Sequence, residues 1–200
     1  MLNHVSDTTE LRRTPTPVRD LVCGWGSAML LLWLLAAGLG CQAERPELSK
    51  GAAAFKKHVH TVLAALQAPL ASALVSGDAA LLDRSLEKAC VALESKGQGI
   101  SGVVLVLDLR GVALSRYPRQ ELPTRRFSDY ALVQRVLRDR KTFAGLLYLP
   151  PGKKLYAVCS PIIERGDNFV GILTIVMQES EVQQKWELGP AEFLSIDFNL

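Results

Sequence analysis

The sequence predicts an α+β domain in which long helices precede a five-stranded antiparallel sheet that carries one inserted helix. Three observations support this fold class. Apolar residues recur every three or four positions from Lys50 to Leu74, which is the period of a helix. After Gly102 the pattern changes to short apolar runs rich in β-branched residues. Tight turns join several of these runs, and strands joined by tight turns pair antiparallel.

The N-terminal half of this pattern predicts two helices. Pro69 lies inside the first and lacks a backbone N–H, so we expect a kink or a restart there. The sequence Ser76-Gly77-Asp78 is typical of a helix end followed by an N-cap. The second helix ends near Gly97, and its apolar face is formed by Leu82, Leu86, Ala89, Cys90 and Leu93.

The remaining elements follow from apolar runs and turn residues. The predicted strands are Val103–Leu107, Val112–Tyr117, Phe143–Leu149, Leu155–Ile163 and Phe169–Met177. Asp108–Gly111 fits a type I turn and Pro150-Pro151-Gly152 a type II turn. Ser128 is the expected N-cap of an inserted helix that runs through Leu137. A short helix over Glu179–Trp186 and a tail over Phe193–Leu200 complete the chain.

The first forty residues differ from the rest. A polar block with three arginines precedes Leu21–Gly40, which is twenty residues long and uncharged. A basic region, an apolar region and a small-residue exit are the parts of an export signal. The sequence Ala36-Ala37-Gly38-Leu39-Gly40-Cys41 resembles the lipobox of bacterial lipoproteins, although Gly38 stands where that motif usually has leucine.

Two interpretations of this segment remain open. In the first, it is a lipoprotein signal that is cut before Cys41, and the Cys41 sulfur carries the lipid. In the second, Leu21–Gly40 stays uncut as a membrane anchor, since twenty uncharged residues at ~1.5 Å each span a ~30 Å hydrocarbon core. Both place the rest of the chain outside the cytoplasm, in a bacterial envelope facing the periplasm or the exterior.

The order of elements resembles a single Cache domain, the extracytoplasmic relative of PAS. The hairpin over Val103–Pro118 is similar to the Cache hairpin with its acidic-Gly turn, and Phe127–Gly145 to the helix beside the ligand. Lys153–Gln178 resembles the closing strands. We therefore divide the chain into a leader (1–40), a tether (41–48), a Cache/PAS-like domain (49–178) and a C-terminal helix and tail (179–200).

The resemblance implies that a small molecule binds between the sheet and the segment over Arg116–Lys141. Residues 110–141 contain nine basic and three acidic side chains, a local surplus larger than the net charge of +3 of the whole chain. Because guanidinium groups bind carboxylates through two parallel hydrogen bonds, we expect a small organic anion. The candidate ligand-binding residues are Arg116, Tyr117, Arg125, Arg126 and Tyr130.

Other functions find little support in the residues. His58 and His60 lie about 200° apart around a helix axis and cannot share a metal ion, so we expect neither a metal, a cofactor nor catalysis. The charge of +3 is too small to indicate a nucleic-acid partner. Cys90 and Cys159 either form a disulfide or are ordinary buried thiols.

The predicted function is therefore that of a membrane-anchored small-molecule sensor lipoprotein. No kinase, cyclase or second span is recognisable after residue 178, so a protein partner is expected to receive the signal. The alternative is a structural or interaction lipoprotein that uses the same fold to bind another envelope protein.

The lipid prediction is tested at Cys41. Labelled palmitate should enter the wild-type protein, whereas the Cys41→Ser variant should stay unlabelled and uncut. Equal labelling of both proteins would contradict lipidation at Cys41. A wild-type protein that is unlabelled but bound to membranes would indicate the uncut anchor.

Overall fold

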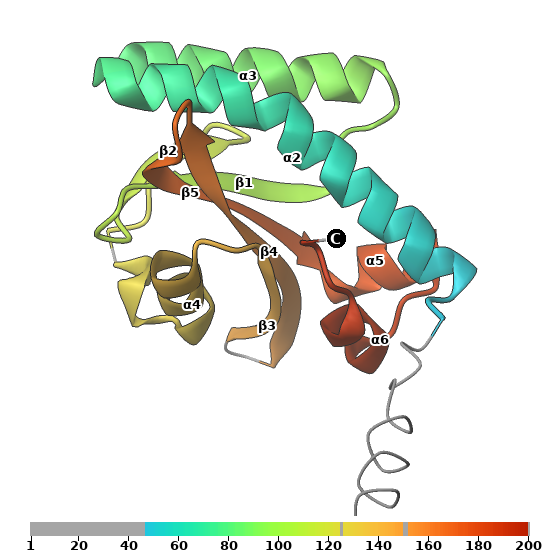
Figure 1. Cartoon of the computed structure of the whole chain (residues 1–200). Helices are drawn as coiled ribbons and strands as arrows, with labels where there is room; N and C mark the ends of the chain where they lie inside the picture. The colour runs from blue at the N-terminus through green and yellow to red at the C-terminus, as the bar shows by residue number, and fades with distance from the viewer. Residues whose placement is uncertain (1–46, 125, 150–151, 200) are drawn as a thin grey trace, which may run out of the picture. The chain divides into compact units, whose positions relative to one another are not determined.

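The computed structural model describes residues 47–124, 126–149 and 152–199. In these residues a five-stranded antiparallel sheet is covered by helices on both faces, which confirms the predicted α+β class (Figure 1). The leader, Cys41, most of the tether, Arg125 and the two prolines of the Pro150–Gly152 turn lie outside the described residues.

Two helices open the domain. α2 spans Lys50–Ser76 and begins at Ser49, whose Oγ accepts a hydrogen bond of 3.1 Å from the Ala52 N–H. α3 spans Ala79–Ser95 and begins at Asp78, whose carboxylate accepts from two backbone N–H groups. The two caps and the left-handed residue between the helices reproduce the predicted helix end and restart.

Pro69 does not divide the first helix. Of the two outcomes expected at Pro69, a kink or a restart, the restart is excluded, because α2 continues through this residue for another two turns. Figure 1 shows one bent helix. The missing N–H of Pro69 costs one backbone hydrogen bond. The packing of nine buried α2 residues, including Leu66 and Leu70 on either side of Pro69, stabilises the continuous helix.

The sheet has the strand order β2-β1-β5-β4-β3, and every neighbouring pair is antiparallel. The strands are β1 (Gly102–Leu107), β2 (Ala113–Tyr117), β3 (Phe143–Leu149), β4 (Lys153–Glu164) and β5 (Asn168–Gln178). The Asp108–Gly111 turn is present as predicted, since the Gly111 N–H donates to the Asp108 carbonyl over 3.0 Å. The first strand thus pairs with the last, which places β2 at one edge and β3 at the other.

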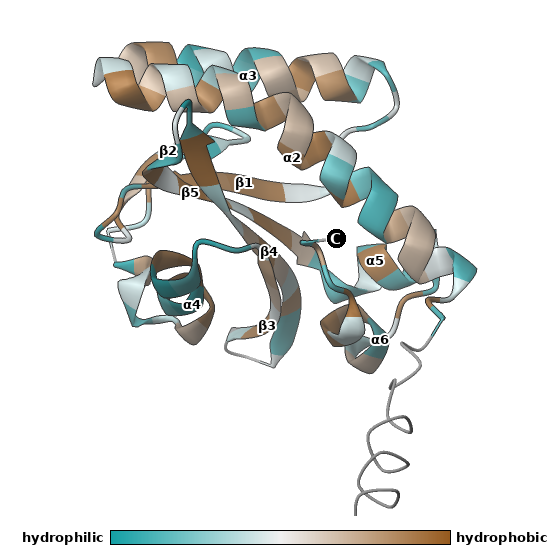
Figure 2. Ribbon diagram, viewed as in Figure 1, coloured by the Kyte–Doolittle hydropathy of each residue, from teal (hydrophilic) through white to brown (hydrophobic). Residues whose placement is uncertain are grey.

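The two faces of the sheet bury separate clusters. The main core lies under α2 and α3 and takes alternate strand residues, among them Val104, Val106, Tyr156, Val158, Leu173 and Ile175. The second core lies on the opposite face and includes Leu105, Leu107, Ala157, Cys159 and Ile172. Because successive side chains of a strand point to opposite faces, a strand buried on both sides needs apolar residues on both, and Figure 2 shows hydrophobic stretches in β1, β4 and β5.

The second core is covered by α4 (Ala131–Asp139), which follows a short 3₁₀ helix, η1 (Phe127–Asp129). The predicted cap at Ser128 is wrong. Ser128 lies within η1, and Tyr130 occupies the N-cap position of α4 without a side-chain hydrogen bond. The extra 3₁₀ turn therefore moves the helix start two residues beyond the expected position.

The C-terminal residues are part of the domain rather than a tail. α5 (Glu179–Trp186) and α6 (Pro190–Ser195) pack on the main core, and the compact unit begins at Glu47 and includes them. The Phe193 ring stacks on Tyr156 with centroids 4.4 Å apart. A boundary at residue 178 would cut through this core, because the buried residues continue with Val182, Trp186, Leu188, Phe193, Ile196 and Phe198.

The two cysteines considered for a disulfide are both free and buried. Cys90 lies in the main core and Cys159 in the second core, so the sheet separates their side chains. Burial raises the pKa of each thiol to about 12. The structure therefore supports the interpretation of both as small core residues.

Adjacent residues in α6 test whether the C-terminal segment belongs to the core. Phe193 is fully buried, whereas Leu194 is 51% exposed. Phe193→Ala should lower the free energy of unfolding of the full chain by about 3–5 kcal/mol, because it leaves a cavity beside Tyr156. Leu194→Ala is the matched control and should change it by less than about 0.5 kcal/mol. Equal values for the two variants in denaturant unfolding would contradict the packing of α6.

Candidate functional site

The edge strand β2 presents its residues alternately to the two faces of the sheet. Arg116 pairs with Leu105 of the second core, so its side chain lies on the α4 face. Tyr117 pairs with Val104 of the main core and lies on the α3 face. Two neighbouring residues of the predicted ligand set are therefore separated by the sheet.

A cavity of about 270 Å³ lies on the α4 face, next to Arg116. Its floor consists of aliphatic side chains from four strands, namely Val103, Leu105, Leu147, Leu155 and Val176. Except for the buried Leu105, these floor residues are only half-buried. This part of the sheet therefore presents an apolar surface that the described helices leave partly exposed.

The wall opposite the floor comes from the segment between β2 and α4, through Pro123, Phe127 and Tyr130. The Phe127 and Tyr130 rings stack with centroids 5.8 Å apart. The Phe127 N–H donates to the Gly111 carbonyl over 2.7 Å, which fastens η1 to the β1–β2 turn. Gly111 has φ +74° and no room for a Cβ against the Ser128 backbone, so both the turn and this close approach require glycine.

Arg116 is the cationic residue among those that line the cavity. Its Nε atom is buried and has no hydrogen-bond partner among the described residues. A buried donor without a partner costs free energy, and the cost is larger for a charged group. The Arg116 Nε–H is thus a donor that an anion in the cavity could satisfy.

The other candidate ligand-binding residues do not all lie at this cavity. Tyr130 lines the cavity. Arg126 is exposed and is not among the lining residues, and Arg125 lies outside the described residues. Of the predicted set, the structure therefore brings Arg116 and Tyr130 to one cavity.

Tyr117 is bound to α3 instead. Its hydroxyl donates to the Glu94 carboxylate over 2.9 Å, and this hydrogen bond raises the pKa of Tyr117 to about 12. Ser115 has the same orientation, and its hydroxyl donates to Asp83 over 2.6 Å. These two hydrogen bonds hold β2 against α3, on the face opposite the cavity.

Much of the basic surplus is surface charge. Arg138 forms an ion pair with the adjacent Asp139 at 2.7 Å, and both side chains are solvent-accessible. The Arg135 guanidinium lies 4.1 Å from the centroid of the Phe143 ring, beside a different cleft. Of the basic residues over 110–141 that the structure describes, Arg116 is therefore the one that lines the cavity.

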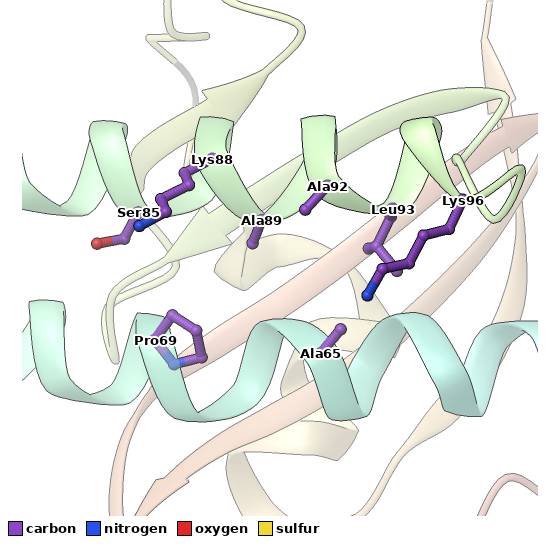
Figure 3. Close-up of a pocket in the computed structure, with 8 residues that line it drawn as sticks. All are labelled: Ala65, Pro69, Ser85, Lys88, Ala89, Ala92, Leu93 and Lys96. Atoms are coloured by element: carbon purple, nitrogen blue, oxygen red, sulfur yellow. The ribbon is translucent and has the colours of Figure 1, made fainter.

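A second hollow is the groove between α2 and α3, with a volume of about 390 Å³ (Figure 3). Small side chains such as Ala65, Ala89 and Ala92 line it, with Lys88 and Lys96 exposed at its rim. Within the described part of the chain, none of these lining residues has a buried side-chain donor that lacks a hydrogen-bond partner. The cavity beside Arg116 is therefore the better candidate for a specific ligand site.

The structure adds the apolar floor, which the sequence analysis did not assign to the site. Leu147 pairs with Leu155 across β3 and β4, and Val103 pairs with Val176 across β1 and β5. The strands were visible in the sequence as apolar runs. The register that brings these four residues together depends on long-range pairing, and no local signal specifies it.

Two further properties of the described residues bear on what the chain can bind. No group of three or more His, Cys, Asp or Glu side chains lies close enough to hold a metal ion there. α2 is long and apolar enough to cross a membrane by length and composition. Its apolar residues instead form the main core with the sheet.

Comparison with known proteins gives a consistent picture of the fold. No family model and no curated protein sequence matches this chain. Solved structures do match. A domain of a sensory box/GGDEF family protein from Vibrio parahaemolyticus has a TM-score of 0.53 at 13% identity, over 83% of this chain and 65% of that one.

Two chemoreceptor domains match with ligands in their structures. The ligand-binding domain of the amino acid chemoreceptor PctC from Pseudomonas aeruginosa PAO1, in complex with GABA, has a TM-score of 0.51 at 17% identity. The match covers 69% of this chain and 63% of that one. That of the Pseudomonas fluorescens chemoreceptor CtaA, in complex with L-isoleucine, has a TM-score of 0.52 at 10% identity, over 80% and 63%.

The fold is of the Cache type. The predicted resemblance of the chain to a single Cache domain is thus confirmed at the level of architecture. The chain spans less than two thirds of the length of each of these three structures. Two of the similar structures are ligand-binding domains of chemoreceptors. At these identities the matches establish the fold of this Cache-type chain, while its ligand is a separate question.

The orientation of Tyr117 can be tested by its titration. The phenol should ionise near pH 12, and Glu94→Gln should lower its pKa toward the ordinary value of 10.0, because the carboxylate acceptor is lost. Tyr117→Phe identifies the signal in the difference absorbance. Since the folded-state pKa is raised, its stabilising effect is complete below pH 10.0 and is lost as the pH rises through about 12. A pKa near 10.0 in the wild-type protein would contradict the Tyr117–Glu94 hydrogen bond.

Proposed function

We propose that this chain is a membrane-anchored extracytoplasmic sensor that binds a small organic anion in the cavity beside Arg116. The observation that supports this most directly is the buried Arg116 Nε–H, which has no partner among the described residues. A carboxylate can accept from Nε and a terminal nitrogen of the same guanidinium through two parallel hydrogen bonds. The ligand would thus satisfy the donor that the described protein groups leave unpaired.

The surroundings of Arg116 favour such a contact. Apolar strand residues and the Phe127 and Tyr130 rings line the same cavity. Because water is partly excluded from such a site, a charge-assisted hydrogen bond there is stronger than on an open surface. Tyr130, which also lines the cavity, carries a hydroxyl group that can both donate and accept a hydrogen bond.

The similar structures agree with this ligand class. The two chemoreceptor complexes contain GABA and L-isoleucine, both of which carry a carboxylate. Arg125 and Arg126 precede the wall residues Phe127 and Tyr130 in sequence and remain candidates for attracting the anion toward the cavity. Tyr117, whose hydroxyl binds Glu94, is better suited to holding β2 in place than to contacting the ligand.

The proposal also includes the anchor and the output. Lipid on Cys41, or an uncut Leu21–Gly40 segment, would hold the domain at the membrane surface. A protein partner would receive the signal. The alternative of a lipoprotein that only binds another envelope protein is less well supported, because a cavity lined by apolar groups and one cation suits a small ligand.

Ligand binding is tested by substitutions at Arg116. A thermal-shift screen of organic acids on the full chain, followed by calorimetry, should identify a carboxylate that binds the wild-type protein. Arg116→Ala should weaken its affinity by roughly ten- to a hundredfold, which corresponds to the loss of a charge-assisted contact of about 1.5–3 kcal/mol. Arg116→Lys should also weaken it, because lysine keeps the charge but lacks the planar fork.

The matched control is Arg138→Ala, which removes an exposed arginine that pairs with Asp139 outside the cavity. Its affinity for the same acid should equal that of the wild-type protein. A screen in which no anion stabilises the chain, or an equal loss in the Arg138 variant, would contradict the proposed site.

A further inference from the structure

The charges around the cavity are unbalanced in a way that bears on its ligand. Among the described residues that line it, Arg116 is cationic and none is acidic. The acidic residues nearest in sequence to the cavity wall, Glu121 and Asp129, are exposed and do not line it. The lined space thus offers a partner for one carboxylate and no carboxylate for an ammonium group.

This composition disfavours amino acids. An amino acid bound through Arg116 would place its ammonium group in a cavity whose floor is aliphatic, with residues such as Leu147, Leu155 and Val176. A buried charge without a partner is strongly unfavourable in such surroundings. A second carboxylate would meet the same difficulty, since no second cation lines the described part of the cavity.

We infer that the cavity selects monocarboxylates with an apolar body, such as short or branched aliphatic acids, over the corresponding amino acids. The inference rests on the proposed function and specifies its ligand class. The aliphatic floor would bury the body of such an acid while Arg116 binds its carboxylate. The volume of about 270 Å³ lies below the roughly 300–1,000 Å³ of sites for drug-sized ligands, which fits a small acid.

Pairs of acids that differ by one amino group test this selectivity. The probes are butyrate against 4-aminobutyrate and 3-methylpentanoate against L-isoleucine, with acetate and succinate for comparison. Calorimetry would be performed on the full chain and on its Arg116→Ala and Arg138→Ala variants. Each acid should bind at least tenfold more tightly than its amino-substituted counterpart. From acetate to butyrate, affinity should rise by up to about fourfold per added methylene.

The floor is tested in the same series by Leu147→Ala. This variant should weaken 3-methylpentanoate several-fold and leave acetate nearly unchanged, because acetate has only one methyl group to bury. Arg116→Ala should weaken every acid that binds, and Arg138→Ala should weaken none.

The outcomes distinguish this inference from the proposed function. If L-isoleucine, 4-aminobutyrate or succinate binds more tightly than the apolar acids, and Arg116→Ala abolishes that binding, the anion site stands and the inferred selectivity is wrong. If no acid binds, or if binding is unaffected in Arg116→Ala, both the proposed anion site and the inferred selectivity are wrong.

Discussion

The unequal cover of the two sheet faces determines most of this structure. α2 has 27 residues and a length of about 40 Å, which matches the ~40 Å of the twelve-residue strand β4. It can therefore cover one face from end to end, together with α3, α5 and α6. On the other face α4 has nine residues and a length of about 14 Å. A helix of that length leaves part of the sheet uncovered, and the cavity lies on that face.

Adjacent residues of the edge strand β2 make contacts on opposite faces of the sheet. Its Arg116 lies at the cavity, while the neighbouring Ser115 and Tyr117 donate hydrogen bonds to Asp83 and Glu94 of α3. The two-residue period of a strand makes this division unavoidable. Arg116 is thus held in place by partners on the opposite side of the sheet, which lie apart from the proposed ligand site.

Much of the fold was predictable because its signals are local. The helical period of α2, the cap at Asp78 and the turn at Gly111 each depend on residues close together in sequence. The errors arose where tertiary contacts decide. Packing against the main core keeps α2 continuous across Pro69. Phe193 was expected in a tail, but its aromatic contacts with Phe55 and Tyr156 place it in the core.

The candidate site was predictable in part for the same reason. A basic surplus and the Cache resemblance pointed to the segment over Arg116–Lys141, and Arg116 and Tyr130 line a cavity. Adjacency in sequence also grouped Arg116 with Tyr117, although strand geometry separates them. The apolar floor depends on cross-strand register between residues tens of positions apart, such as Val103 with Val176. Local patterns contain no information about that register.

The central claim is that the buried Arg116 Nε–H receives an anionic ligand, and the most direct test observes this group itself. In ¹⁵N-edited NMR spectra, the Arg116 Nε–H resonance can be assigned by its loss in Arg116→Lys. Titration with 3-methylpentanoate should shift this resonance and slow its exchange with water, while the Nε–H of Arg138 stays unchanged. A resonance of Arg116 that does not respond, with changes at Arg138 or other surface arginines instead, would contradict the account.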